Sequence, residues 1–143
     1  MRKALFLAMI GVVASGCLKT LWLKGGKDLN PVEGTPTPVT VWIFQLSDEA
    51  RFRAASEKIM DEEGRSAELG NDLLKVLPTT VDPGKESQIE LKPEDIKAGT
   101  RYIGIVANFG TLKGSDWKAV VTLDQVNRMR FNFDGTKITY GPR

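Results

Sequence analysis

The amino-acid sequence predicts an all-β protein, a two-sheet β-sandwich with a helical insertion between its second and third strands. Roughly seven or eight short segments rich in β-branched and aromatic residues recur along the chain, separated by turn-forming residues. Only the stretch at about residues 47–74 has helical spacing. A length of 143 residues with 14 glycines and 7 prolines fits one domain with many turns.

The first two predicted strands flank a long loop. Residues 18–23 are apolar and predict the first strand, whereas residues 24–38 are rich in glycine and proline and predict a loop. Residues 39–46 (VTVWIFQL) combine β-branched and aromatic side chains in alternation. This pattern predicts a well-buried second strand.

The insertion follows the second strand. Ser47 is a suitable N-cap, with Asp48 and Glu49 in the first turn at the positive end of a helix dipole. Apolar residues then recur at helical spacing: Phe52, Ala55 and Ile59. Gly64 predicts the end of this helix, and residues 67–74 predict a shorter helical turn or loop that Gly70 interrupts.

The remaining segments return to strand patterns. They are residues 75–80, 87–91, 101–109 and 117–123, followed by a final hairpin. A turn is predicted at Asp82-Pro83-Gly84 between the first two of these strands. In the hairpin, the pair Asp134-Gly135 suits a type I′ turn.

The N-terminal residues have the pattern of a secretory signal. Arg2 and Lys3 precede an uncharged apolar run at residues 4–13, which is well short of the roughly 20 residues that span a bilayer. The small residues 14–16 end directly in Cys17, and this arrangement resembles the lipobox of bacterial lipoproteins. The resemblance implies a diacylglycerol and an N-acyl chain on Cys17. The alternative is an ordinary signal peptide that leaves Cys17 as a free thiol.

These patterns divide the chain into three parts. Residues 1–16 are a signal peptide that is removed, residues 17–23 are the lipidated N-terminus with the first strand, and residues 24–143 are the sandwich domain. The formal charge of +2 falls to zero once Arg2 and Lys3 are removed with the signal. A charge so near balance does not suggest a dedicated nucleic-acid surface.

Composition excludes most familiar active sites. The chain has no histidine and one cysteine, which removes Ser-His-Asp triads, Cys-His pairs, Cys/His zinc sites and internal disulfides. The acidic run at residues 61–63 lacks the ligand spacing of a calcium loop, so it predicts a solvated helix end. The glycines at 25–26 and 110–114 lack P-loop spacing and predict turns.

The three tryptophans have different predicted places. Trp42 and Trp117 lie in apolar strands, which predicts core packing. Trp22 lies close to the predicted lipid anchor. Its ring could lie among lipid headgroups or cover the edge of the sandwich, and the sequence does not decide between these two places.

Several segments, in order and spacing, carry a family resemblance. They are Leu29-Asn30-Pro31, residues 38–46 (PVTVWIFQL), Phe52 followed by Ala55, residues 68–72 (ELGND), Leu77-Pro78 through Gly84, and residues 102–109 (YIGIVANF) followed by Trp117. Together with the lipobox, they resemble the type VI secretion lipoprotein family TssJ (SciN) over nearly the whole mature chain.

The resemblance implies a sandwich of transthyretin-like type, tethered to the inner leaflet of the outer membrane and facing the periplasm. It implies a protein that is not an enzyme and has no cofactor, metal, nucleic acid or small-molecule substrate. The implied partner is the periplasmic C-terminal part of the inner-membrane protein TssM, and indirectly TssL. Leu18 agrees with the outer membrane, since no Asp follows Cys17 to resemble an inner-membrane retention signal.

The resemblance also implies that the loop between the first two strands grips TssM. The loop residues are Asn30, Pro31, Val32, Glu33, Gly34, Thr35, Pro36, Thr37 and Pro38. The prolines reduce the conformational freedom that the loop loses on binding. The alternative is that this segment is only a turn-rich connection.

Two other functions stay open at this point. A lipid-anchored carrier of a small apolar ligand would need a sizeable apolar cavity. An enzyme that uses only carboxylates, such as a glycosidase, would need two of them across a cleft, roughly 5 to 9.5 Å apart.

Overall fold

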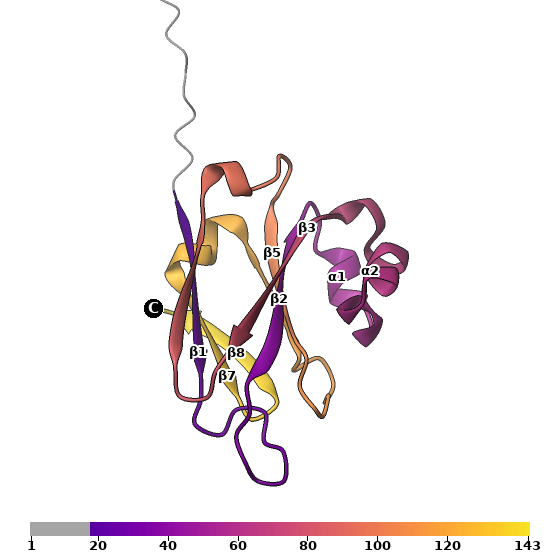
Figure 1. Ribbon diagram of the computed structural model, residues 1–143. Helices are drawn as coiled ribbons and strands as arrows, with labels where there is room; N and C mark the ends of the chain where they lie inside the picture. The colour runs from indigo at the N-terminus through magenta and orange to yellow at the C-terminus, as the bar shows by residue number, and fades with distance from the viewer. Residues whose placement is uncertain (1–17) are drawn as a thin grey trace, which may run out of the picture.

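The computed structural model describes residues 18–143 and confirms the predicted two-sheet β-sandwich with helices on one side (Figure 1). The strands are β1 (Lys19–Gly25), β2 (Val39–Leu46), β3 (Leu73–Val81), β4 (Glu86–Leu91), β5 (Tyr102–Ala107), β6 (Lys118–Thr122), β7 (Met129–Asp134) and β8 (Lys137–Pro142). The first sheet has the order β4-β1-β7-β8, and the second has the order β3-β2-β5-β6. Neighbouring strands are antiparallel except for β1 and β7, which pair in parallel.

The connection between β2 and β3 is helical, as predicted. It contains the helices α1 (Ala50–Ala54) and α2 (Glu62–Leu69) and the 3-10 turns η1 (Glu57–Met60) and η2 (Gly70–Asp72). Two further 3-10 turns, η3 (Pro93–Asp95) and η4 (Leu123–Arg128), precede β5 and β7. In Figure 1, α1 and α2 lie beside the second sheet, on the side away from β1.

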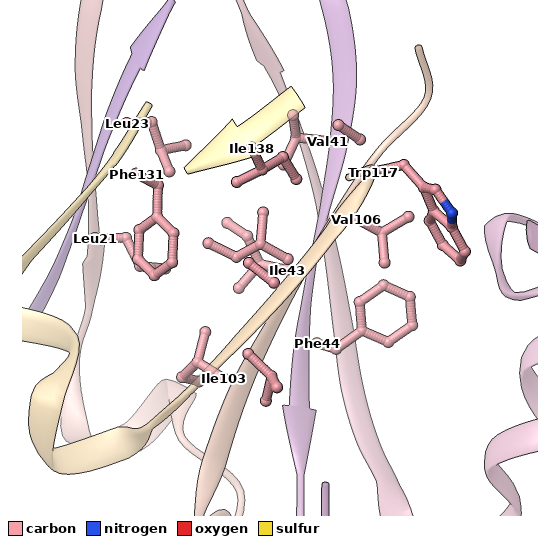
Figure 2. Close-up of a cluster of buried hydrophobic side chains, with 14 of the residues drawn as sticks. Leu21, Leu23, Val41, Ile43, Phe44, Ile103, Val106, Trp117, Phe131 and Ile138 are labelled. Carbon is pink, nitrogen blue, oxygen red and sulfur yellow. The ribbon is translucent and has the colours of Figure 1, made fainter. Parts of the chain in front are cut away.

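The two sheets enclose an apolar core because alternate residues of a strand point to the same face. Leu21 and Phe131 of the first sheet are buried, and so are Ile43 and Ile103 of the second (Figure 2). Burying each such side chain contributes about 1.5–3 kcal/mol to folding. This core holds the sheets together and fixes the ends at which their loops meet.

A second apolar layer joins the insertion to the second sheet. Phe44 points away from the core between the two sheets. Its ring centre lies 5.5 Å from that of Phe52 in α1. Gly104 of β5 pairs with Phe44, and a Cβ atom there would lie only 2.7 Å from the Phe52 ring. The missing side chain at residue 104 therefore lets Phe52 pack directly on the sheet.

The internal boundaries of the insertion differ from the prediction. Ser47 is not the N-cap of α1: Glu49 has that position, and the Ser47 hydroxyl donates to Asp72 at 3.4 Å. Gly64 does not end a helix but lies inside α2. Glycine is required at this position because a Cβ atom would collide with the Lys58 carbonyl of η1.

Two other segments of this region were also wrongly predicted. The acidic residues 61–63 begin α2 instead of ending a helix. Leu73 and Leu74 belong to β3, where they were predicted to continue a helical turn or loop.

The final hairpin is confirmed, but its turn type was wrong. Asp134 pairs with Lys137, so the two loop residues are Gly135 and Thr136. A type I′ turn needs positive φ at both, and only Gly135, at 56°, has it. The pair Asp134-Gly135 therefore does not form the centre of this turn.

Trp117 is buried, as predicted, and Trp42 is half-buried beneath the Arg65 guanidinium, 5.4 Å from the ring centre. Trp22 is half-buried on β1.

Candidate functional site

The loop between β1 and β2, residues 26–38, lies at the end of the sandwich opposite the start of β1 (Figure 1). Hydrogen bonds tie its first residue to neighbouring turns at this end. The backbone N–H of Gly26 donates to the Phe133 carbonyl at 2.8 Å, and the Gly26 carbonyl accepts from the Gly84 N–H at 3.1 Å. The loop therefore begins on a fixed support.

Asn30 fixes the base of the loop. Its backbone N–H donates to the Gly135 carbonyl at 2.7 Å, and its Oδ1 accepts from the Gly110 N–H at 2.8 Å. Its Nδ2 donates to Thr37 Oγ1 at 3.0 Å, and that hydroxyl donates to the Asn30 carbonyl at 2.6 Å. The φ of Asn30 is 43°, in the left-handed region that Asn tolerates better than most residues.

The tip of the loop is a miniature hairpin. Val32 and Thr35 exchange two backbone hydrogen bonds, of 2.8 and 2.9 Å. Glu33 and Gly34 both have positive φ, 50° and 77°, which is the pattern of a type I′ turn. The hairpin leaves the Val32 side chain 53% exposed. The loop therefore presents an apolar side chain on a backbone that is already ordered.

The structure separates the predicted contact residues into two groups. Residues 31–36 and Pro38 are exposed, and they include the whole hairpin tip. Asn30 is only 8% exposed and Thr37 is half-buried, so these two residues position the loop. Cys17, the predicted lipidation site, lies outside the described residues.

Sequence reasoning missed the second segment that supports this loop. Residues 110–114 were predicted to be a turn, but Gly110 is also a hydrogen-bond partner of Asn30. The two residues are 80 positions apart in the chain. No local pattern could have brought them together.

Lys118 of β6 is a second residue that sequence reasoning missed. Its Nζ donates to the carbonyl oxygens of Phe52, Arg53 and Ala55, at 2.9, 2.7 and 2.7 Å. Carbonyls at a helix end have no partner within the helix, and Lys118 supplies one at the end of α1. Burial lowers the pKa of Lys118, while nearby Glu68 raises it and Arg53 lowers it further.

Groups that could support other chemistry are dispersed. A depression of about 170 Å³ beside Lys118 and Tyr140 is open to solvent and lined by charged as well as apolar residues. The carboxylates of residues 61–63 are exposed at the start of α2. Within residues 18–143, no three His, Cys, Asp or Glu side chains lie together as a metal site would require.

No helix in the described part of the chain has the length and apolar character needed to cross a membrane.

Comparison with known proteins identifies a family. The family model described as "Type VI secretion lipoprotein, VasD, EvfM, TssJ, VC_A0113" matches residues 19–137. Among curated proteins, none matches the chain.

Several solved structures share the fold. The T6SS lipoprotein TssJ1 from Pseudomonas aeruginosa is 24% identical, with a TM-score of 0.73 over 88% of this chain and 95% of that chain. Lip of Serratia marcescens, a membrane-bound component of the type VI secretion system, is 17% identical, with a TM-score of 0.72 over 87% of this chain and 96% of that chain. A chain of a structure described as the TssM C-terminal domain (869–1107) from EAEC is 19% identical, with a TM-score of 0.71 over 88% and 98%. At these identities the likeness shows a common fold.

Proposed function

The chain belongs to the type VI secretion lipoprotein family, TssJ or SciN, and we propose that it anchors the secretion apparatus at the outer membrane by binding the periplasmic part of TssM. The observation that carries the proposal is the ordered hairpin tip at residues 32–35, at the end of the sandwich away from the start of β1. Acylation of Cys17 would hold one end of the domain at the membrane. The loop, at the other end, would then remain accessible to a partner in the periplasm.

The proposed contact surface is the exposed tip, and its base is the support. Binding costs conformational entropy when a flexible segment must be ordered. The backbone bonds between Val32 and Thr35 and the bonds of Asn30 order this loop in the free protein. An exposed apolar side chain such as Val32 then contributes buried area on binding without that cost.

The proposed partner has support from a structural relative. One chain with the same fold comes from a structure described as the TssM C-terminal domain. Lip of Serratia marcescens, with the same fold, is described as a membrane-bound component of the secretion system. Contact with TssL would be indirect, through TssM. The proposed role is assembly, without catalysis, cofactor or small-molecule substrate, and no specific observation favours the carrier or the carboxylate enzyme.

The test exchanges the tip and leaves its base intact. Residues 31–36 are replaced by a Gly/Ser segment of equal length, while Asn30 and Thr37 are kept. We expect the variant to remain folded, as judged by a cooperative thermal unfolding transition. We expect it no longer to co-purify with the TssM periplasmic domain. Val32→Glu, a single charge at the exposed tip, should weaken the same interaction.

A matched control separates tip contact from general surface chemistry. Leu77→Glu places the same charge at another exposed apolar residue, in the edge strand β3. It should leave TssM binding unchanged. If the tip variant binds TssM as well as the wild-type protein does, the loop is not part of the interface. If TssM is absent from pull-downs with the wild-type protein, the proposed function is refuted.

A further inference from the structure

The outer faces of the two sheets differ. α1 and α2 lie beside the second sheet, and neither lies on the outer face of the first (Figure 1). Strand register identifies the residues of that uncovered face, since Trp22 of β1 pairs with Gln88 of β4 and with Arg130 of β7. We call it the Trp22 face; it comprises Thr20, Trp22, Lys24, Glu86, Gln88, Glu90, Arg130, Asn132, Asp134, Lys137, Thr139, Gly141 and, over the Trp22 ring, Arg143.

Two arginines lie at Trp22, Arg143 over its ring and Arg130 as its register partner on β7. The Arg143 guanidinium lies 4.1 Å from the centre of the Trp22 ring. The Arg143 N–H donates to the carbonyl of Arg128 at 2.9 Å, so these two residues are adjacent. Arg130 makes one exposed ion pair, with Glu86 at 3.3 Å.

The local charge around Trp22 is therefore positive. Within residues 18–143, the side chains of Arg128 and Arg143 have no acidic partner. Glu90, on the edge strand β4, and Asp134, which pairs with Lys137 at the end of β7, are the other carboxylates that strand register puts on this face beside Glu86. An anion that approaches Trp22 would meet the Arg143 guanidinium, which has no acidic partner among residues 18–143.

The position of Trp22 in the chain puts this face near the anchor. Only Leu18 separates Cys17 from β1, and Trp22 is five positions after Cys17. Since a strand rises about 3.3 Å per residue, Trp22 can be at most about 17 Å from the acylated residue. A domain attached with so short a connection can lie with β1 along the membrane surface.

We propose that the Trp22 face docks on the anionic phospholipid headgroups of the membrane that holds Cys17. This inference rests on the proposed acylation of Cys17. Guanidinium groups bind phosphate in a bidentate manner, which suits Arg128 and Arg143. Tryptophan is favoured at the level of the headgroups, which assigns Trp22 to the membrane interface. The loop at residues 26–38 remains at the edge of the docked domain, accessible to a partner.

The experiment measures which face of the acylated mature protein is near the lipid. Cys17 is the single native cysteine and would be acylated, so an introduced cysteine is the one reactive thiol. A donor dye is attached at Gln88→Cys on the Trp22 face or at Ser66→Cys on α2, both of them exposed positions. Energy transfer is measured to a headgroup-labelled lipid in phosphatidylcholine vesicles with and without phosphatidylglycerol.

We expect stronger transfer from residue 88 than from residue 66, and a difference that grows with phosphatidylglycerol and shrinks with salt. Removing one basic residue near an anionic surface should lower the docked population about fivefold relative to the undocked. The double variant Arg128→Gln/Arg143→Gln should therefore lose most of the difference. The control Lys27→Gln/Lys113→Gln removes equal charge from exposed residues of the loop end and should keep it.

The outcomes separate this inference from the proposed function. Equal transfer from both positions, or transfer indifferent to phosphatidylglycerol, would overturn docking while acylation and TssM binding stand. Docking would also be overturned if Arg128→Gln/Arg143→Gln loses TssM binding while energy transfer to the labelled lipid is unchanged. The Trp22 face would then contact protein instead of lipid. Failure of the wild-type chain to sediment with neutral vesicles would instead contradict acylation.

Discussion

Gly104 is a residue at which the second sheet lies directly against the helical insertion. Phe52 lies against the backbone there because no side chain intervenes. Asn30 has a comparable role at the loop, where one side chain bonds to both Thr37 and Gly110. In each case a single residue determines how two segments that are distant in the sequence meet.

Replacing Gly104 by Ala should destabilise the fold by about 1–3 kcal/mol, because overpacking forces neighbouring side chains and backbone to shift. The new Cβ would lie 2.7 Å from the Phe52 ring. Urea denaturation followed by circular dichroism gives the free energy of unfolding. Gly141→Ala in β8 is the control, since a Cβ there meets no atom within 4 Å. Equal losses in the two variants would contradict the argument.

At the scale of elements, the insertion is held by contacts with the second sheet. α1 has five residues, too few for a helix to be stable in isolation. Phe52 packs it on the sheet, and the Lys118 ammonium group binds three carbonyl oxygens at its end. The helix is therefore held by tertiary contacts more than by its own sequence.

Lys118→Met keeps most of the aliphatic side chain and removes the three donated hydrogen bonds. The Phe52 carbonyl keeps the Ala55 N–H as a donor and the Arg53 carbonyl is exposed, so the loss falls on the part-buried Ala55 carbonyl, and leaving such a group without a partner costs about 1–3 kcal/mol. We expect the free energy of unfolding to fall by an amount of that order. Amide hydrogen exchange should become faster in α1 than it is in the wild-type protein, and this increase should be larger in α1 than in β2. Lys113→Met is the control, because Lys113 is exposed and its side chain bonds to no residue among 18–143. A stable variant with unchanged exchange in α1 would show that Lys118 does not hold the helix.

The same scale explains which features the sequence could predict. Strand β2 was predicted at its observed bounds because alternation and β-branched residues act locally. The break between α1 and α2 was not predicted at its observed place, because Gly64 was interpreted as a helix end. Glycine is required there instead by the close approach of the Lys58 carbonyl. The bonds of Lys118 to the insertion and of Asn30 to Gly110 join residues more than 60 positions apart and leave no local pattern.

For the loop, no particular turn type was predicted at the tip. Glu33-Gly34 is not among the residue pairs typical of type I′ turns, although both residues have the required positive φ. The prediction that residues 30–38 contact TssM came from family resemblance, and the structure divides them into an exposed tip and a supporting base.

At the scale of the whole molecule, the start of β1 and the loop lie at opposite ends of the sandwich (Figure 1). Attachment and partner binding should therefore be separable. Cys17→Ser should move the protein from the membrane to the soluble periplasmic fraction, and isothermal titration with the TssM periplasmic domain should give an unchanged Kd. Exchange of residues 31–36 should do the reverse, keeping the protein in the membrane fraction and abolishing the binding heat. A Kd that rises in the Cys17→Ser protein would mean that the two ends are coupled, which the rigid core between them argues against.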